Sequence, residues 1–481
     1  MKRNILFILY CFVAFSLHAA EVNYLTVQVQ GPGQLGQALG NQATKIDSLK
    51  IIGGPIDASD FRIIWEASFY GNLTSLNLEH ALIKNNSIPD FALYDVQEQY
   101  IKPGRTVYLP LHRIILPENI EHIGKYAFAR MELDDINIPS SIKSFDSGSF
   151  MSCHWLSKDK FIIPEGVTEI PYLCFQHCQS IKEFVLPTTL KAIIGGAFEN
   201  TRMEKINFPD GLESIGMAAF QGSGELKEAI LPESCLNIQD FTFSLCDSLR
   251  YVQIPKGLKR IPANFVSYSN VLEEVTLPNG ITEIGSDAFS ICTKLHKINL
   301  PEGLQKIEAR AFSYCNLDSI ILPTTLLEIG SQCFTDGIQG SVLSKSTTPP
   351  TCLKPELPFG QMYHLSNILY VPIGSADAYR SAWGWSEFNK IVETDFKFLS
   401  EAKDIVDAYD ILPSFECHSD GGSIIIDTSS MNGIHYDVYT TDGCEITSGT
   451  INSTTMTIYV SPGAYIVKVG STSRKLMVSC S

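Results

Sequence analysis

Apolar and polar residues alternate in a phrase that recurs along the middle of the chain. Each copy is a short alternating stretch ending in apolar-Pro, followed by Leu or Ile, then commonly Ile-Gly, and then Phe. The prolines stand 22 to 25 residues apart. They are Pro117, Pro139, Pro164, Pro187, Pro209, Pro232, Pro255, Pro278, Pro301 and Pro323. Self-similarity at this period is typical of a leucine-rich-repeat solenoid, in which stacked neighbours bury the apolar face that one repeat cannot bury alone.

One unit shows how the pattern predicts a coil. In residues 295–301, apolar residues alternate with polar ones, which is the period of a half-buried strand, and Pro301 ends the hydrogen-bonded ladder. Each repeat is therefore predicted to form one short parallel strand. After the turn, Leu304 and Ile307 are expected to face the interior.

A phenylalanine follows the repeat proline at a nearly constant distance. The residues are Phe128, Phe150, Phe175, Phe198, Phe220, Phe243, Phe289, Phe312 and Phe334, with Phe265 one position early. We predict that these rings stack from coil to coil as the spine of the core, because a small residue usually precedes each one. Burial of each ring contributes about 1.5–3 kcal/mol in transfer terms.

Most cysteines also keep the repeat register. Three residues after a spine phenylalanine stand Cys153, Cys178, Cys246, Cys292 and Cys315, and Cys174 and Cys333 directly precede one. This placement favours buried free thiols that act as small apolar fillers. Disulfides between neighbouring coils, Cys153 with Cys178 or Cys292 with Cys315, are the alternative for an exported chain.

The repeat carries a family resemblance. Residues 277–292, Leu-Pro-Asn-Gly-Ile-Thr-Glu-Ile-Gly-Ser-Asp-Ala-Phe-Ser-Ile-Cys, resemble the repeat of the BspA-like leucine-rich-repeat proteins found on the surfaces of bacteria and some protozoa. Residues 348–350, 369–372 and 383–385 are similar to the segment that closes such arrays. The resemblance covers most of residues 25–393. It implies a secreted or surface binding and adhesion protein rather than an enzyme.

The ends of the chain predict export and a second domain. Lys2-Arg3, an apolar run over residues 5–17 and His18-Ala19-Ala20 have the features of a cleaved signal peptide, and the run is too short to be a permanent membrane span. We predict a signal peptide at 1–20, an N-terminal cap at 21–110, the repeat array at 111–345, its C-terminal cap at 346–394, a linker at 395–413 and a small β-sandwich at 414–481.

The cap also contains a glycine pattern of the dinucleotide-binding kind. Gly31, Gly33 and Gly36 match its spacing, and Asp57 follows about 20 residues on. That signal requires a βαβ unit within one domain, whereas export, the intervening Pro32 and a simple capping turn account for these glycines. We therefore expect no cofactor.

The predicted sandwich resembles the C-terminal sorting domains of the Bacteroidetes type IX secretion route. The resemblance rests on residues 437–443 and 461–469. Where those domains usually have Gly-Arg after the turn, this chain has Gly443-Cys444. The module is thus a sorting signal, a terminal cap or a surface attachment.

The net charge of the chain argues against nucleic acid and anionic membranes as partners. Removal of Lys2 and Arg3 takes the formal net charge from −16 to −18, and no basic block remains that would attract nucleic acid or an anionic membrane. We expect export to the cell surface or the extracellular space, with the periplasm as an alternative. No Gly-x-Ser-x-Gly, His-Glu-x-x-His or calcium-loop pattern is present, and the histidines are scattered.

The outward side chains of the predicted strands are the candidate ligand-binding face. Apolar anchors among charged neighbours are typical of an interface. The candidates are Lys160, Ile162, Glu183, Val185, Lys205, Glu228, Ile230 and Tyr251. Cross-strand charge pairing that only stabilises the sheet is the competing interpretation for any one of them.

These features together predict a leucine-rich-repeat solenoid with short parallel strands, followed by a small all-β sandwich. The predicted function is non-catalytic binding or adhesion through the repeat face, to a host or neighbouring-cell protein or glycan. A structural surface-layer component is the alternative, and a secreted glycan-processing enzyme is a more distant one.

Overall fold

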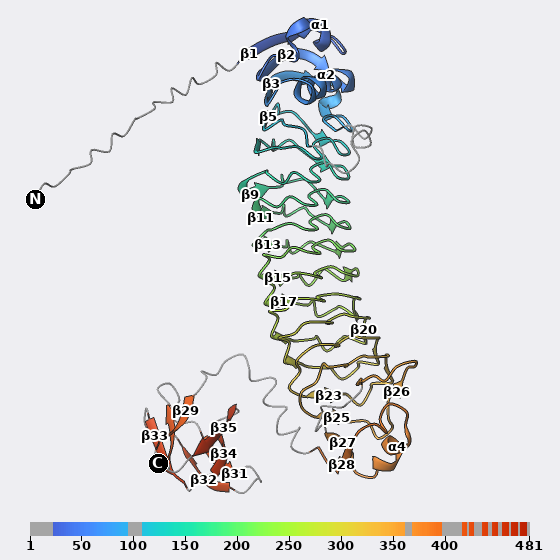
Figure 1. Ribbon diagram of the computed structural model, residues 1–481, viewed down its shortest axis with the longest axis vertical. Helices are drawn as coiled ribbons and strands as arrows, with labels where there is room; N and C mark the ends of the chain where they lie inside the picture. Colours follow the sequence, from blue (N-terminus) through green and yellow to red (C-terminus); the bar gives the residue numbers. More distant parts are fainter. Residues whose placement is uncertain are drawn as a thin grey trace, which may run out of the picture. The chain divides into compact units, whose positions relative to one another are not determined.

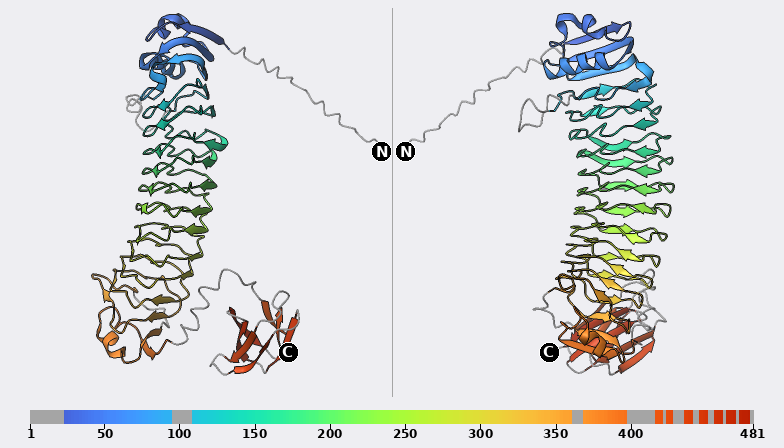
Figure 2. Two further views of the ribbon diagram at one scale, coloured as in Figure 1. Left: turned by 180° about the vertical axis from the view of Figure 1, so that it is seen from behind. Right: turned by 90° about the vertical axis from the view of Figure 1, so that its right-hand side faces the viewer.

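A computed structural model of the chain describes residues 23–94, 108–360 and 368–396, and strands between residues 416 and 478. The chain divides into two compact units, Met1–Glu393 and Thr394–Ser481. The first unit is a stack of coils built from parallel strands, which confirms the predicted solenoid (Figures 1 and 2). The predicted signal peptide, residues 1–20, and residues 397–413 of the predicted linker lie outside the described residues.

The N-terminal end begins with a parallel strand–helix arrangement. Its elements are β1 (Tyr24–Val29), α1 (Leu35–Leu39), η1 (Gly40–Gln42), β2 (Ser48–Ile56), α2 (Ala58–Phe69) and β3 (Ser75–Ile83). Because β3 pairs in parallel with the first regular strand, β5 (Arg113–Ile115), this region covers the apolar end of the stack.

The glycine loop of this region is filled from within the protein. It lies between β1 and α1, and β1 pairs in parallel with β2, so a strand–helix–strand unit does surround it. However, the N–H groups of Gly33 and Leu35 each donate to the Asp60 carboxylate at 2.9 Å. Asp60 is fully buried. Its carboxylate therefore takes the donors with which such a loop would hold a phosphate.

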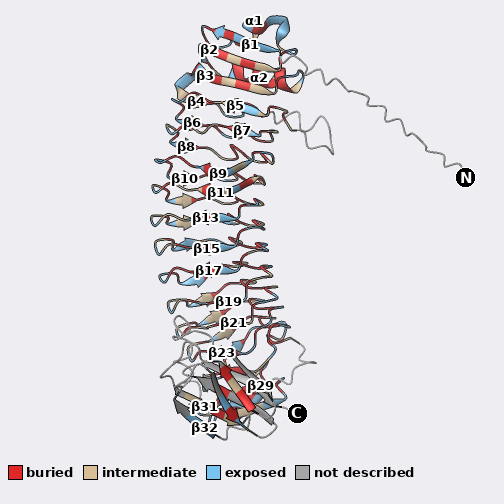
Figure 3. Ribbon diagram, turned by 90° about the vertical axis from the view of Figure 1, so that its left-hand side faces the viewer, coloured by how far each residue is buried: buried red, intermediate tan, exposed pale blue. Residues whose placement is uncertain are grey.

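Each regular coil has two short strands, not the single one predicted. The first column continues from β5 with β7 (Asp135–Ile136), β9 (Lys158–Ile162), β11 (Ile181–Val185), β13 (Lys205–Asn207), β15 (Glu228–Ile230), β17 (Tyr251–Gln253), β19 (Glu274–Val275), β21 (Lys297–Ile298) and β23 (Ile320–Leu322). The second comprises β4 (Ser87–Ile88), β6 (His122–Ile123), β8 (Ser144–Phe145), β10 (Glu169–Ile170), β12 (Ala192–Ile193), β14 (Ser214–Ile215), β16 (Asn237–Ile238), β18 (Arg260–Ile261), β20 (Glu283–Ile284), β22 (Lys306–Ile307), β24 (Glu328–Ile329) and β26 (Thr351–Cys352). The first column alternates exposed and buried residues, as predicted (Figure 3).

The predicted phenylalanine spine forms the core of the stack. Phe175, Phe198, Phe220 and Phe243 stack with centroids 5.3–5.6 Å apart and interplanar angles of 9–14°. Phe289, Phe312, Phe334 and Phe359 continue in the same way after a break. All these rings are buried.

Phe265 is not the spine residue of its coil. The spine residue of each coil donates its N–H to the residue that precedes the next spine position, and Phe243 donates to Phe265. Val266, whose N–H donates to Ala288, thus occupies the spine position, while Phe265 fills the place of the usual small residue. Phe243 and Phe265 meet edge to face, at 79°. The one-residue offset in the sequence is therefore an exchange of the large and small positions.

The cysteines do more than fill space. Cys153 Sγ lies 3.0 Å from the carbonyl oxygen of Phe128, one coil earlier, and Cys292 Sγ lies 3.2 Å from that of Val266. Ser223 donates to Phe198 from the same position at 3.0 Å. The cysteines from Cys153 to Cys352 are free, as predicted. Burial raises the pKa of Cys292 to about 12, so the thiol stays protonated and unreactive.

This contact predicts how the position tolerates change. Cys292→Ser should cost about 1 kcal/mol or less, because a hydroxyl can donate to the same carbonyl, as Ser223 does. Cys292→Ala should cost about 1–2 kcal/mol, because the bond is lost and a small void remains. Urea unfolding of the two variants measures the difference. Equal costs would show that the thiol acts only as a filler.

The array ends in a cap made of three strands and one helix. It comprises β25 (Val342–Ser344), β27 (Ile368–Pro372), α4 (Ala376–Ser381) and β28 (Lys390–Thr394). Trp385 is fully buried there, and its indole N–H donates to the Pro350 carbonyl at 2.8 Å. Tyr379 packs edge-on against Trp385 at 5.1 Å. These aromatic side chains close the open end of the spine.

The second unit consists of two antiparallel sheets. One has the order β29 (Glu416–Asp420), β30 (Ser423–Asp427), β33 (Thr455–Tyr459), and the other has the order β32 (Glu445–Thr450), β31 (His435–Thr440), β34 (Gly463–Val469), β35 (Thr472–Val478). Ile424, Ile426 and Ile458 from the first sheet and Val438 and Val467 from the second are buried. The predicted small β-sandwich is confirmed.

Candidate ligand-binding face

The predicted face consists of the outward side chains of the first strand column, hereafter the first strand face. Its candidate residues lie on β9, β11, β13, β15 and β17. Ile162 faces Val185 and Lys160 faces Glu183 in register across β9 and β11, and Glu228 faces Tyr251 across β15 and β17. The fold thus places the predicted residues on successive coils.

Exposure distinguishes the anchors from one another. Ile162, Ile230 and Tyr251 are 61%, 50% and 48% exposed, whereas Val185 is only partly exposed. Exposed aliphatic and aromatic side chains in such a row are available to a partner. Val185, which is paired with Ile162 on β9 and Asn207 on β13, contributes less apolar surface than the sequence pattern suggested.

The charged candidates form two groups. Lys160 Nζ lies 3.2 Å from a Glu183 carboxylate oxygen, so this pair stabilises the sheet in the way that the competing interpretation requires. Lys205 and Glu228 form no ion pair with any residue in the described part of the chain. Their charges remain open to a ligand.

A groove separates β13 from β15. The ladder of the first column is interrupted there, because β13 ends one sheet and β15 begins another. The opening has a volume of about 410 Å³. Its lining residues are Glu204, Lys205, Ile206, Asn207, Phe208, Lys227, Glu228 and Ile230. Three of the predicted candidates, Lys205, Glu228 and Ile230, therefore border one concavity.

The sequence analysis did not single out Phe208, Glu204 and Lys227 as part of the site. Phe208 stands directly before its repeat proline, where the neighbouring repeats have Leu186 and Leu231. Its ring packs edge-on against spine residue Phe220 at 5.5 Å and remains partly exposed in the groove. The phenylalanine in place of leucine is the sequence feature that could have indicated the groove. Lys227 Nζ spans the coils to Glu204 at 2.9 Å.

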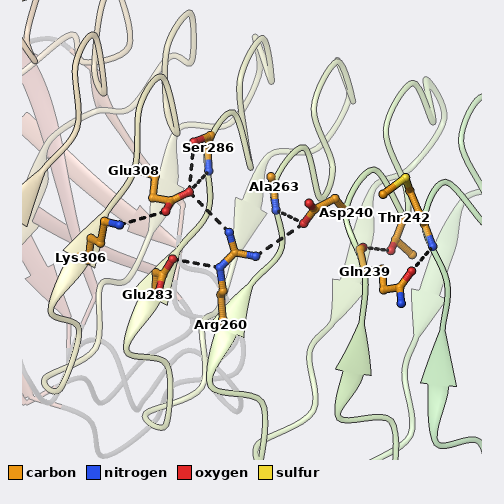
Figure 4. Close-up of polar contacts among 10 residues, drawn as sticks. Gln239, Asp240, Thr242, Arg260, Ala263, Glu283, Ser286, Lys306 and Glu308 are labelled. Atoms are coloured by element: carbon orange, nitrogen blue, oxygen red, sulfur yellow. Dashed lines mark hydrogen bonds and ion pairs between the residues drawn. The ribbon is translucent and has the colours of Figure 1, made fainter. Parts of the chain in front are cut away.

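The outward side of the second column, the second strand face, is charged and internally paired. Arg260 lies between Asp240, Glu283 and Glu308, at 3.6, 3.0 and 3.5 Å (Figure 4). Glu308 also accepts from Lys306 at 3.1 Å and from the Ser286 N–H at 3.0 Å. This face joins neighbouring coils through its own ion pairs and offers a partner few open charges.

The Glu308 contacts predict an acid-sensitive contribution to stability. Burial opposes ionisation of Glu308, but hydrogen bonds from Lys306 and Ser286 lower its pKa from 4.5 to about 2. A depressed carboxyl pKa stabilises the fold above the unfolded value and loses that contribution as the pH falls through the folded value. Wild type should therefore exceed Glu308→Gln in melting temperature at neutral pH, with the gap closing between pH 4.5 and 2.

Thermal melts across that pH range measure this gap. Glu225→Gln, at an exposed position outside the network, is the matched control and should follow wild type at every pH. A gap that persists unchanged at low pH would contradict the ionic origin of the contribution.

The described residues contain no cluster of three or more His, Cys, Asp or Glu side chains that could hold a metal ion. Within the same residues, no helix has the length and apolar character needed to cross a membrane. The chemistry that the first strand face offers is apolar contact, hydrogen bonding and open charge.

Comparison with known sequences and structures identifies the repeat. The profile of the BspA-type leucine-rich repeat region matches residues 106–227 and 213–339, in six copies. The repeat array therefore belongs to the BspA-type leucine-rich repeat family. No curated protein sequence matches the chain.

Solved structures place the BspA-type array among leucine-rich repeat folds. A leucine-rich repeat protein from Bacteroides ovatus is 20% identical with a TM-score of 0.54, and the match covers 77% of this chain and 92% of that one. A second such protein, from Eubacterium ventriosum, is 20% identical over 70% of this chain and 94% of that one, with a TM-score of 0.39. The pneumococcal vaccine antigen PcpA is 17% identical over 78% and 95%, with a TM-score of 0.39. The first likeness supports the fold, and the other two scores are too low to support more.

Proposed function

We propose that this protein is an exported, non-catalytic binding protein of the cell surface, and that its ligand docks on the first strand face. The observation that carries the proposal is the groove between β13 and β15. It combines an exposed apolar anchor, Ile230, with two charges, Lys205 and Glu228, that have no ion-pair partner among the described residues.

Between the two ligand classes expected from the sequence, this composition favours a protein over a glycan. Protein interfaces combine a desolvated apolar anchor with a polar rim, and charges of both signs fix the register of the partner. Ile162 and Tyr251 extend the apolar surface to either side of the groove. At the usual strand spacing, the five strands span roughly 20 Å, which is wide enough for a polypeptide segment.

The C-terminal sandwich is proposed to serve in attachment or sorting. The support is its resemblance to type IX sorting domains and its compact antiparallel fold. Gly443-Cys444 replaces the usual Gly-Arg of those domains. Deletion of residues 414–481 should therefore release the protein from the cell surface if the module attaches it.

The binding proposal is tested with a four-residue variant. Wild-type protein is first screened against immobilised extracellular-matrix proteins and a glycan array. For a protein ligand found in this screen, simultaneous change of Ile162, Val185, Ile230 and Tyr251 to serine should weaken binding by at least about 1–2 kcal/mol, the usual scale for loss of interface anchors. The melting temperature should change little, because these side chains point outward.

Ile321→Ser is the matched control. Ile321 is also exposed and also stands two positions before a repeat proline, but it lies on β23, away from the groove. The control should bind like wild type. Unchanged affinity of the four-residue variant would refute the site, and a large fall in its melting temperature would show that the side chains only hold the sheet together. Turnover of chromogenic glycosides by the purified protein would instead support the enzyme alternative.

A further inference from the structure

The third side of each coil carries a feature that the strand faces lack. Two residues per coil, four positions apart, have a left-handed backbone, for example Asp287 at φ 55° and Ile291 at φ 59°. We name the segments that contain them the turn edge. The second left-handed position is occupied, coil by coil, by Arg130, Ser152, His177, Asn200, Gly222, Leu245, Tyr268, Ile291, Tyr314 and Asp336.

Four of these residues form a continuous apolar row, hereafter the aromatic row. They are Leu245, Tyr268, Ile291 and Tyr314. The N–H of each member donates to a backbone carbonyl in the next coil, at 2.8–2.9 Å, and the accepting residue always directly precedes the equivalent left-handed position. The members therefore stand in register on consecutive coils. Leu245, Tyr268 and Tyr314 are 42%, 43% and 52% exposed, and Ile291 is partly exposed.

The residues of the row adopt a left-handed backbone conformation that is energetically unfavourable for their side chains. A left-handed conformation suits Gly and Asn, which the chain uses at Gly222 and Asn200, whereas a β-branched residue such as Ile291 is strained there. Strain of this kind persists where the rest of the structure imposes it, and it clusters at functional sites. The large side chains of the row are therefore not explained by the needs of the turn.

The row stands on a rigid base. Directly beneath it, the buried hydroxyls of Ser244 and Ser267 lie 2.8 Å apart, and those of Ser290 and Ser313 lie 2.9 Å apart. These hydroxyl pairs and the backbone ladder hold neighbouring coils at fixed spacing. Binding of a ligand to the row therefore carries a small entropic cost for ordering the protein.

A polar row accompanies the aromatic row. Two positions after its members stand Asp247, Asn270, Thr293 and Asn316. Thr293 Oγ1 donates to Asn270 Oδ1 at 3.2 Å, so two of these side chains meet across neighbouring coils. Neither row contains a lysine or an arginine, the side chains that bind phosphate and sulfate most strongly. Amide, hydroxyl and carboxylate groups instead match the hydroxyl pairs of a sugar.

We propose that the aromatic row and its polar neighbours bind a neutral glycan chain laid along the solenoid axis. Sugar rings present C–H faces that pack on tyrosine and aliphatic side chains, and hydroxyls that pair with Asn, Asp and Thr. The coil spacing of about 4.8 Å is close to the length of one pyranose unit in an extended chain. Each coil would therefore meet one sugar ring, with Tyr268 and Tyr314 contacting alternate units.

This site is separate from the groove on the first strand face and does not depend on it. The probes are neutral cello-, chito-, manno- and xylo-oligosaccharides of increasing length, titrated by calorimetry against the full mature protein. Affinity for at least one series should rise with chain length until the chain covers the four coils of the row, and then level off. Tyr268→Asn with Tyr314→Asn should weaken that binding by at least about tenfold.

Stability separates this outcome from misfolding. Asn accepts the left-handed backbone, so the double variant should melt at or above the wild-type temperature. Tyr172→Ser, at an exposed tyrosine outside the row, is the matched control and should bind like wild type. The four-residue variant of the first strand face should also keep its glycan affinity. The proposal is overturned if no oligosaccharide series binds, or if the double variant binds as tightly as wild type.

Discussion

Phe220→Ala is expected to lower the free energy of unfolding of the repeat array by about 3–5 kcal/mol, the usual cost of deleting a buried ring. Phe220 is fully buried in the middle of the spine. Its ring stacks on Phe198 and on Phe243 at 5.3 Å each, and Phe208 packs against it edge-on at 5.5 Å. Ladder hydrogen bonds fix the coils on both sides, so the neighbours cannot collapse into the space.

Denaturant unfolding of this variant beside Asn207→Ala measures the effect. Asn207 is exposed on β13 of the same repeat, and its truncation should change the midpoint very little. Because each coil contacts mainly its neighbours, a defect at Phe220 is also expected to separate the unfolding of the two halves of the stack. Equal destabilisation by the two variants would mean that the strands present the opposite faces to the core.

The spine and the strand alternation could be predicted because both follow from fixed sequence distances. A residue two before the repeat proline, such as Ile162 or Ile230, must point outward if the residue before it and the one after it point inward. Tyr251 stands four residues before its repeat proline, so the same alternation predicts that its side chain points outward. The second strand of each coil escaped prediction because two residues carry no measurable period, as β22 illustrates.

The features that matter most for binding depend on backbone geometry that the repeat pattern does not encode. The groove lies between β13 and β15, at one of several places where the ladder of the first column is interrupted, and the size of Phe208 is the sequence feature that marks this coil. The aromatic row requires knowledge of which position is left-handed in every coil. Tyr268 and Tyr314 are not remarkable as single residues in the sequence, and only their shared register makes a surface.

Gly337→Cys should destabilise the array by about 3 kcal/mol or more, although it restores the commonest residue of the repeat at that position. Gly337 follows spine residue Phe334 by three, where other coils have Cys292 or Cys315. A Cβ added at Gly337 would lie 2.2 Å from the carbonyl oxygen of Phe312. That atom belongs to the backbone of the preceding coil, so the clash is relieved only by moving the coil.

The matched control is Ser223→Cys, which makes the same consensus change at a position that already carries a Cβ. Ser223 Oγ already donates to the Phe198 carbonyl at 3.0 Å, and a thiol fills this role at Cys153 and Cys292. Its cost should stay below about 1 kcal/mol. Urea unfolding of both variants decides whether the coils share one geometry. If Gly337→Cys costs as little stability as Ser223→Cys, the close approach of Gly337 to the Phe312 carbonyl is wrong. A loss of stability in Gly337→Cys alone shows that these two coils lie closer together than the coils at Ser223.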